Sequence, residues 1–311
     1  MCPERAGTPA VRQNPFAGGE VSISQFFQAS PNVFLFKHAP VRVCTRYLQV
    51  LGTLYYLANR RERAQIENNI LAVFQSRKDA KDIVRGVFRG IFSHYSEKLI
   101  VAHRNYAILK RELRDTIEYS GLRYLDDALE RGGVVLVTGH FGGVEFLPLA
   151  LALRGYPVTM IVSFQTERLR ESLMERAAEV DAELIDGHRE QVMFQAIRAL
   201  KRGRILLTVC DEVDAWKPRG NQTIQAFGGS VLIDRTLEVL CRRTGSTVLG
   251  SFMVRTGRSY RLTIVPIGDP ESAGEGDMSA AILRTFEQFV MMFPDQWYQW
   301  RKFHKMRPET A

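Results

Sequence analysis

The sequence predicts an α/β protein with a mixed or mainly parallel sheet flanked by helices, preceded by a helical region. From about residue 122, short apolar runs alternate with helical patterns, which is typical of a sheet with covering helices. Before that point the periodicity is helical throughout, and 311 residues that are 45% hydrophobic suffice for a sizeable core. We expect a flexible leader at 1–22, a helical region at 23–121 and an α/β core at 122–311, the last two forming one continuous domain.

The apolar runs and the helical patterns place the elements of this core. Strands are expected at 133–138, 157–163, 204–210, 247–254 and 260–266. Helices are expected at 143–154, 167–180, 189–202, 231–244 and 278–292. Upstream, apolar side chains between Ile83 and Tyr95 recur at three- and four-residue steps, which predicts an amphipathic helix used for packing.

The segment from Val41 to Asn59 is apolar but carries Arg42 and Arg46, and three more arginines follow it at positions 60, 61 and 63. It fits either a core helix with a solvated end or an interfacial helix whose arginines meet lipid phosphates. Its apolar run is shorter than the roughly 18 residues that a membrane-spanning helix needs.

The net charge of +8 favours an acidic partner such as nucleic acid, an anionic membrane surface or a phosphate-bearing substrate. The arginines are scattered and no nucleic-acid-binding motif is present, so nucleic acid is not expected. The four cysteines are far apart and form no C-x-x-C pair, which indicates reduced thiols and no structural zinc. Residues 1–20 carry no secretory signal pattern.

His140 follows a buried strand and precedes a glycine turn, and Glu145 falls in the first turn of the next helix. On one helix the two would point about 140° apart, so they can meet only if His140 lies in the loop. Gly142 and Gly143 permit such a turn, and their N–H groups could also hold an anionic oxygen. Glu145 would then fix the tautomer of His140, which would act as a general base. Alternatively, His140 only satisfies a hydrogen bond at the strand end.

The stretch from Gly139 to Glu145 resembles the G-H-F-G-N-W-E block of the lipid A biosynthesis (late) acyltransferases, within the lysophospholipid acyltransferase superfamily. Three later blocks have the same order in the family as in this chain. They are Asp211-Glu212 after a strand, Phe227-Gly228-Gly229 before a helix, and the segment 293–301, which reads FPDQWYQWR. The resemblance covers roughly residues 43–307. The chain has Gly143-Val144 where the family has Asn-Trp, and Glu212 where it has Gln.

The resemblance implies transfer of a fatty acyl group from acyl-CoA or acyl carrier protein to a hydroxyl or amine of a lipid or amphiphilic acceptor. His140 would deprotonate the acceptor, Glu145 would orient His140, and neither a metal nor a further cofactor would be needed. The protein would lie peripherally on the cytoplasmic face of the inner membrane.

Further residues are candidates for substrate binding, each with a structural alternative. Asp211 follows a strand, where α/β proteins often place functional groups, but it could equally be a helix cap or turn residue. Lys217 and Arg219 could meet the phosphates of a donor or lie in a solvated loop. The remaining candidates rest on the resemblance: Gly142, Gly143, Arg176, Phe227, Gly228 and Arg301.

Two rival functions remain. One is a hydrolase with Cys210 as its nucleophile, although the neighbouring Asp211 and Glu212 would raise the pKa of the thiol. The other is a catalytically silent lipid-binding or membrane-binding relative with the same fold.

Overall fold

The computed structural model describes residues 26–74, 79–164, 166–268 and 277–308. A seven-stranded sheet in the order β1-β9-β8-β2-β5-β3-β4 forms its centre, and β8 and β9 are antiparallel while every other neighbouring pair is parallel. The strands are β1 (Ile117–Ser120), β2 (Val134–Thr138), β3 (Val158–Val162), β4 (Glu183–Asp186), β5 (Ile205–Val209), β8 (Thr247–Thr256) and β9 (Ser259–Gly268). The predicted α/β class with a mixed, mainly parallel sheet is confirmed.

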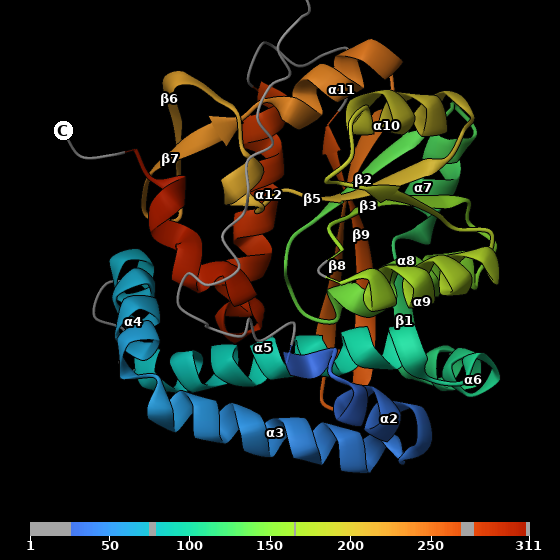
Figure 1. Ribbon diagram of the computed structural model, residues 1–311. Helices are drawn as coiled ribbons and strands as arrows, with labels where there is room; N and C mark the ends of the chain where they lie inside the picture. Colours follow the sequence, from blue (N-terminus) through green and yellow to red (C-terminus); the bar gives the residue numbers. More distant parts are fainter. Residues whose placement is uncertain (1–25, 75–78, 165, 269–276, 309–311) are drawn as a thin grey trace, which may run out of the picture.

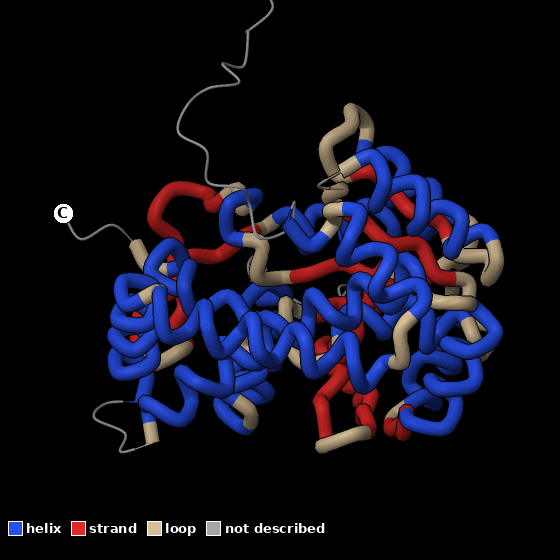
Figure 2. Tube along the Cα trace, turned by 60° about the horizontal axis from the view of Figure 1, so that its bottom comes forward, coloured by secondary structure: helices blue, strands red, loops and turns tan. Residues whose placement is uncertain are grey.

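Helices surround this sheet (Figures 1 and 2). The N-terminal helices are α2 (Ser30–His38), α3 (Val41–Ala58), α4 (Arg60–Phe74), α5 (Ala80–His103) and α6 (Tyr106–Thr116). The later ones are α7 (Leu122–Leu129), α8 (Leu147–Ala152), α9 (Glu167–Ala178), α10 (Val192–Lys201), α11 (Thr236–Thr244) and α12 (Asp277–Met292). Short 3₁₀ segments are η1 (Val144–Phe146), η2 (Val213–Ala215), η3 (Pro294–Gln296) and η4 (Tyr298–Met306).

All five expected strands are present, but three features were not anticipated. The short strand β1 forms one edge of the sheet, paired with β9, and the short strand β4 forms the other edge, paired with β3. A separate antiparallel hairpin joins β6 (Pro218–Ala226) to β7 (Gly229–Asp234), so the helix expected from residue 231 begins only at Thr236. β1 lies inside the region that we expected to be helical, and the leader expected at 1–22 falls outside the described residues.

β2 lies at the centre of the sheet between β5 and β8 and is buried along its whole length. Because successive side chains of a strand point to opposite faces, Val135 and Val137 enter one apolar core while Val134 and Leu136 enter the other. The residues that follow β2 therefore leave the sheet from a firmly held position.

α5 is fastened to the antiparallel pair β8–β9 by a buried ion pair. Glu97 accepts two hydrogen bonds of 2.7 Å from the guanidinium of Arg255 and one of 2.9 Å from the Tyr260 hydroxyl. A bidentate pair of this kind fixes direction as well as distance. It sets the rotation of α5, and with it the face that α5 turns toward the end of β2.

α3 has two apolar faces. Cys44, Leu48 and Gly52 are buried, and α3 packs on α5. The other apolar face consists of Val43, Val50, Leu54 and Leu57, each of which is at least half exposed. Among the described residues, no helix is long and apolar enough to cross a membrane.

Candidate active site

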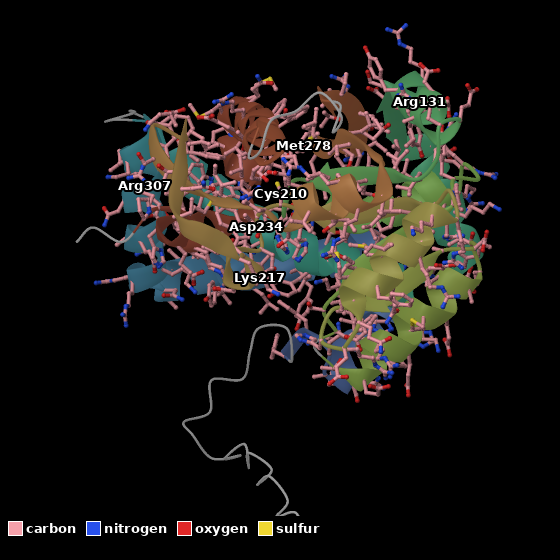
Figure 3. All side chains as sticks on the ribbon, turned by 90° about the horizontal axis from the view of Figure 1, so that it is seen from above. Arg131, Cys210, Lys217, Asp234, Met278 and Arg307 are labelled. Carbon is pink, nitrogen blue, oxygen red and sulfur yellow. The ribbon has the colours of Figure 1, made fainter. Side chains whose placement is uncertain are left out.

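Parallel pairing brings His140 and Asp211 together. Thr138 of β2 is in register with Val209 of β5, and the N–H of Cys210 donates to the carbonyl of Thr138 at 2.8 Å. His140 lies two residues after Thr138, and Asp211 lies two residues after Val209. The two therefore emerge side by side at the carboxyl ends of β2 and β5. This edge of a parallel sheet is where α/β proteins bind ligands. Figure 3 shows that the two ends of these parallel strands are well separated: Cys210 follows β5 at the carboxyl end, and Arg131 precedes β2 at the amino end.

Asp211 binds His140 at two points. Its Oδ1 lies 2.9 Å from the ring Nδ1, and its Oδ2 accepts the backbone N–H of His140 at 2.9 Å. The indole N–H of Trp297 donates to the same Oδ2 at 2.8 Å. Asp211 and Trp297 are fully buried. The carboxylate is therefore held on both oxygens, and with Nδ1–H as its donor the ring keeps the lone pair of Nε2 for the open side.

Charge interactions decide the pKa values of this pair. Burial by itself lowers the pKa of His140, but the adjacent carboxylate of Asp211 outweighs it, so the pKa lies above its ordinary value. Burial by itself raises the pKa of Asp211, but the charge and hydrogen bonds of His140 outweigh it and lower the pKa. Glu212 faces the other ring nitrogen, with Oε2 3.7 Å from Nε2. The raised pKa makes the imidazole a stronger base than an ordinary histidine side chain.

Glu145 does not occupy the place expected for it. Its Oε1 lies 3.2 Å from Nζ of Lys98 and 3.3 Å from Nδ1 of His94, both on α5. The expected contact between Glu145 and the imidazole of His140 is therefore wrong, and Asp211 makes that contact instead. The reason lies in the turn: Gly142 takes a positive φ and η1 begins at Val144, which directs Glu145 toward α5.

The glycine turn serves packing. The N–H of Gly142 donates to the carbonyl of Gln296 at 2.9 Å, and the N–H of Gly143 donates to that of Met253 at 2.7 Å. A Cβ on Gly142 would lie 1.8 Å from the Met253 oxygen, and one on Gly143 would lie 2.6 Å from the ring of Tyr260. The loop therefore lies flat against β8 and β9. Both N–H groups expected to hold an anionic oxygen are already used.

A cavity of about 600 Å³ opens beside His140. Its polar lining residues include His94, Lys98, His140, Glu145 and Glu212, and also Ser163, Arg176, Thr208, Lys217, Asp234 and Thr236. Its other walls are mostly apolar and come chiefly from β3, α9, β4 and α10, with Leu149, Met160, Leu169, Leu173, Ala177, Val180, Leu184 and Met193 among them. A largely apolar pocket with several polar groups suits an amphiphilic ligand.

Arg176 and Lys217 also line this cavity, but their described polar contacts are structural. The guanidinium of Arg176 donates to the carbonyl oxygens of Val101 at 3.0 Å and Arg104 at 2.6 Å, which ties α9 to the last turn of α5. The backbone N–H of exposed Lys217 donates to Asp234 at 2.9 Å, and the two residues lie close together in Figure 3. Arg219 falls within β6, and its side chain lies outside what the structure describes.

The other expected binding residues lie away from the cavity. Phe227 is buried and stacks on Trp297 with ring centres 5.5 Å apart, so it supports the partner of Asp211. Gly228 forms the hairpin turn with a positive φ. Arg301 lies near Glu62, at 3.9 Å, in a second hollow of about 350 Å³ between α4 and η4.

Sequence reasoning missed three contributors to the site. Lys98 and His94 lie on α5, one helical turn apart, and the packing periodicity of that helix hid them. Trp297 falls within the segment 293–301 noted in the sequence, but its bond to Asp211 was not anticipated. A polar pair at i and i+4 within an apolar helix was the available signal. Among the described residues, no group of three or more His, Cys, Asp or Glu side chains could hold a metal ion.

Cys210 is a poor nucleophile in this setting. Burial raises the pKa of its thiol well above the ordinary value, and the neighbouring Asp211 raises it further. The thiol is therefore protonated near neutral pH, which weighs against a cysteine-dependent hydrolase.

A carboxylate-bound histidine in the lining of a largely apolar cavity defines an α/β protein suited to amphiphilic substrates. A family model of the bacterial lipid A biosynthesis acyltransferases matches residues 31–305, and the chain belongs to this family. It is therefore an acyltransferase that acts on a lipid acceptor. A search of curated proteins found no match.

Proposed function

We propose that this protein transfers a fatty acyl group from a thioester, acyl-CoA or acyl carrier protein, to a hydroxyl or amine of a lipid or amphiphilic acceptor. One observation carries the proposal: His140, whose Nδ1 is bound by a carboxylate, lines a cavity whose walls are mostly apolar. The apolar part would hold the acyl chain and bring its thioester to His140. Holding both reactants in line supplies much of the rate enhancement in such reactions.

In this mechanism Nε2 of His140 takes the proton of the acceptor hydroxyl as its oxygen attacks the thioester carbonyl. The new C–O bond forms, the tetrahedral intermediate collapses, and the C–S bond breaks. The departing thiolate receives the proton from Nε2, so the enzyme returns to its starting state. Asp211 holds Nδ1–H throughout and stabilises the imidazolium, as the carboxylate does in other histidine-base sites.

The test uses purified wild-type protein and His140→Ala with bacterial lipid extract, in separate arms with long-chain acyl-CoA and long-chain acyl carrier protein. Mass spectrometry would follow a product heavier by one acyl group. Its loss in the variant supports the proposal, and the productive arm identifies the donor. Equal product from both proteins would remove His140 from the mechanism. No product from either would favour the silent lipid-binding relative.

We further propose that the exposed face of α3 rests on the cytoplasmic surface of the inner membrane. Val43, Val50, Leu54 and Leu57 recur at steps of seven, four and three residues, so they form one stripe. Arg42 and Arg46 are exposed along one side of this stripe and suit anionic headgroups.

A pair of charge-matched variants tests this surface. Val50→Glu/Leu54→Glu places two carboxylates on the stripe, whereas Gln49→Glu/Thr53→Glu places two on exposed positions of the same helix beside it. Co-sedimentation with vesicles containing anionic phospholipid should fall much further for the first variant. Equal binding by both would contradict contact through this stripe.

A further inference from the structure

We propose that Lys98 is a catalytic residue whose ammonium group receives the carbonyl oxygen of the thioester as that oxygen becomes an oxyanion, and that Glu145 positions it. This inference rests on the proposed acyl transfer and adds the electrophilic half of the site. Attack on a carbonyl places negative charge on oxygen, and donors held in advance at that point usually supply the largest single contribution to the rate.

The usual backbone donors at this place are occupied. The N–H groups of Gly142 and Gly143 donate to carbonyl oxygens of Gln296 and Met253, at 2.9 and 2.7 Å. The N–H of His140 donates to Asp211 at 2.9 Å. The loop that follows β2 therefore cannot offer these donors to a substrate oxygen without giving up its own packing. A side chain that lines the same cavity as His140 is then a candidate for the role.

Lys98 has the position and the free donors for it. It lines the same cavity as His140, and its charge is close enough to lower the pKa of both His140 and His94. Its ammonium carries three N–H donors. In the described part of the chain, its polar partner is Oε1 of Glu145 at 3.2 Å. The side chain is 22% exposed and belongs to the cavity lining, so the ammonium is accessible to a ligand bound there.

The placement of Lys98 is rigid. The preceding residue on α5, Glu97, is the one locked to Arg255 and Tyr260, so the helix cannot rotate without breaking a buried ion pair. Glu145, whose side chain is only 18% exposed, also holds the Lys98 ammonium through its Oε1 at 3.2 Å. A charge that is fixed before the reaction needs no reorganisation when the oxyanion forms.

This gives Glu145 a physical role different from the one its spacing from His140 suggested. It does not touch the imidazole, which already has Asp211. It anchors a cation that lines the same cavity as the base, and His94 contacts the same carboxylate oxygen at 3.3 Å. Burial lowers the pKa of His94 well below its ordinary value, so His94 is neutral and leaves Lys98 as the cation at this carboxylate.

The experiment compares initial rates of acyl transfer by wild type, Lys98→Met, Lys98→Arg and Glu145→Gln. Lys81→Met is the matched control, because Lys81 is an exposed lysine in the first turn of the same helix. We expect Lys98→Met to lose about 10²–10³-fold in kcat with little change in KM, as for loss of one oxyanion donor. Lys98→Arg should regain part of that loss because it keeps a charged donor, although its geometry differs. The kcat of Glu145→Gln should lie between those of Lys98→Met and Lys98→Arg. The kcat of Lys81→Met should match that of wild type.

A pH profile separates this role from a structural one. Because Lys98 lowers the pKa of His140, its removal should move the acidic limb of kcat/KM to higher pH. An active Lys98→Met enzyme with wild-type kcat would overturn the inference while leaving acyl transfer by His140 intact. A loss expressed only in KM, or an unmoved acidic limb, would also overturn it. Wild-type protein without any acyl product would overturn the proposed function and this inference together.

Discussion

Asp211 accepts both the backbone N–H and the ring Nδ1–H of His140, each at 2.9 Å, so one carboxylate fixes the main chain and the imidazole of the same residue. The relationship follows from the register of β2 with β5, which sets residue 140 beside residue 211. The tautomer of the base is thus built into the pairing of two central strands.

Asp211→Asn should therefore remove most of the activity without unfolding the protein. An amide in place of the carboxylate no longer favours Nδ1–H and no longer stabilises the imidazolium. We expect kcat to fall about 10²–10⁴-fold, the usual value of general-base assistance. Asp214→Asn is the control, since that carboxylate is also near the site but pairs with Lys302 and Lys305. Comparable losses in both variants would contradict the assignment.

The pH dependence of kcat/KM should report the pKa of His140. The pKa is raised above the ordinary value of about 6.5, so activity should decline as pH falls through a point above 6.5, because the protonated ring cannot accept a proton. Glu212 contributes to raising this pKa, so Glu212→Gln should move the acidic limb to lower pH. Lys98→Met should move it the opposite way. Shifts of the same sign in both variants would be inconsistent with these charges acting on His140.

The ion pair between Glu97 and Arg255 should be critical for stability. Arg255→Met leaves a buried carboxylate without its partner, which typically costs about 3–5 kcal/mol. Arg261→Met on the adjacent strand breaks the exposed pair with Glu118 and should cost less than about 1 kcal/mol. Denaturant unfolding measures both. A double variant, Glu97→Gln with Arg255→Met, should cost less than the sum of the single changes, and strict additivity would argue against a coupled pair.

Gly142 should tolerate no side chain. Gly142→Ala combines a positive φ of 55° with a Cβ 1.8 Å from the carbonyl oxygen of Met253. Gly257→Ala is matched in backbone conformation, at φ 70°, but its Cβ would meet nothing within 4 Å. Thermal unfolding should show a much larger loss for Gly142→Ala, together with lost activity. Equal losses would mean that backbone conformation, and not close packing on β8, explains the glycine.

Filling the apolar cavity should shorten the acyl chain that the enzyme accepts. His94 and Val101 of α5 are seven residues apart, a rise of about 10 Å along the helix, and both line the cavity. Ala177 of α9 is next to Arg176, which bonds to Val101. Ala177→Phe should lower kcat/KM for long chains and spare short ones. Met174→Phe on the exposed side of α9 is the control, and an unchanged chain-length preference in Ala177→Phe would place the chain elsewhere.

The regular parts of the fold were predictable because their patterns are local. All five apolar runs became strands, since a strand buried on both faces is a continuous apolar run. β1 and β4 are only four residues long and their sequences, IEYS and ELID, mix polar and apolar residues. Their strand form comes from pairing with β9 and β3, which no local pattern reveals.

The β6–β7 hairpin and the site partners escaped prediction for similar reasons. The hairpin turns through Phe227 and Gly228, both with positive φ, whereas such turns usually carry Asn or Gly at the first position. Burial of Phe227 against Trp297 overrides that preference. His140 was identified from its strand and turn, but its partner was sought five residues away. The true partner lies 71 residues on, and only the strand order brings it close.

The most direct test of the account is the initial rate of acyl transfer from a radiolabelled long-chain thioester to the acceptor, measured side by side for wild type and His140→Gln. The account predicts steady transfer by wild type and a rate at least about 10²-fold lower for the variant, with both proteins equally folded. Transfer by His140→Gln at the wild-type rate would contradict the assignment of His140 as the base.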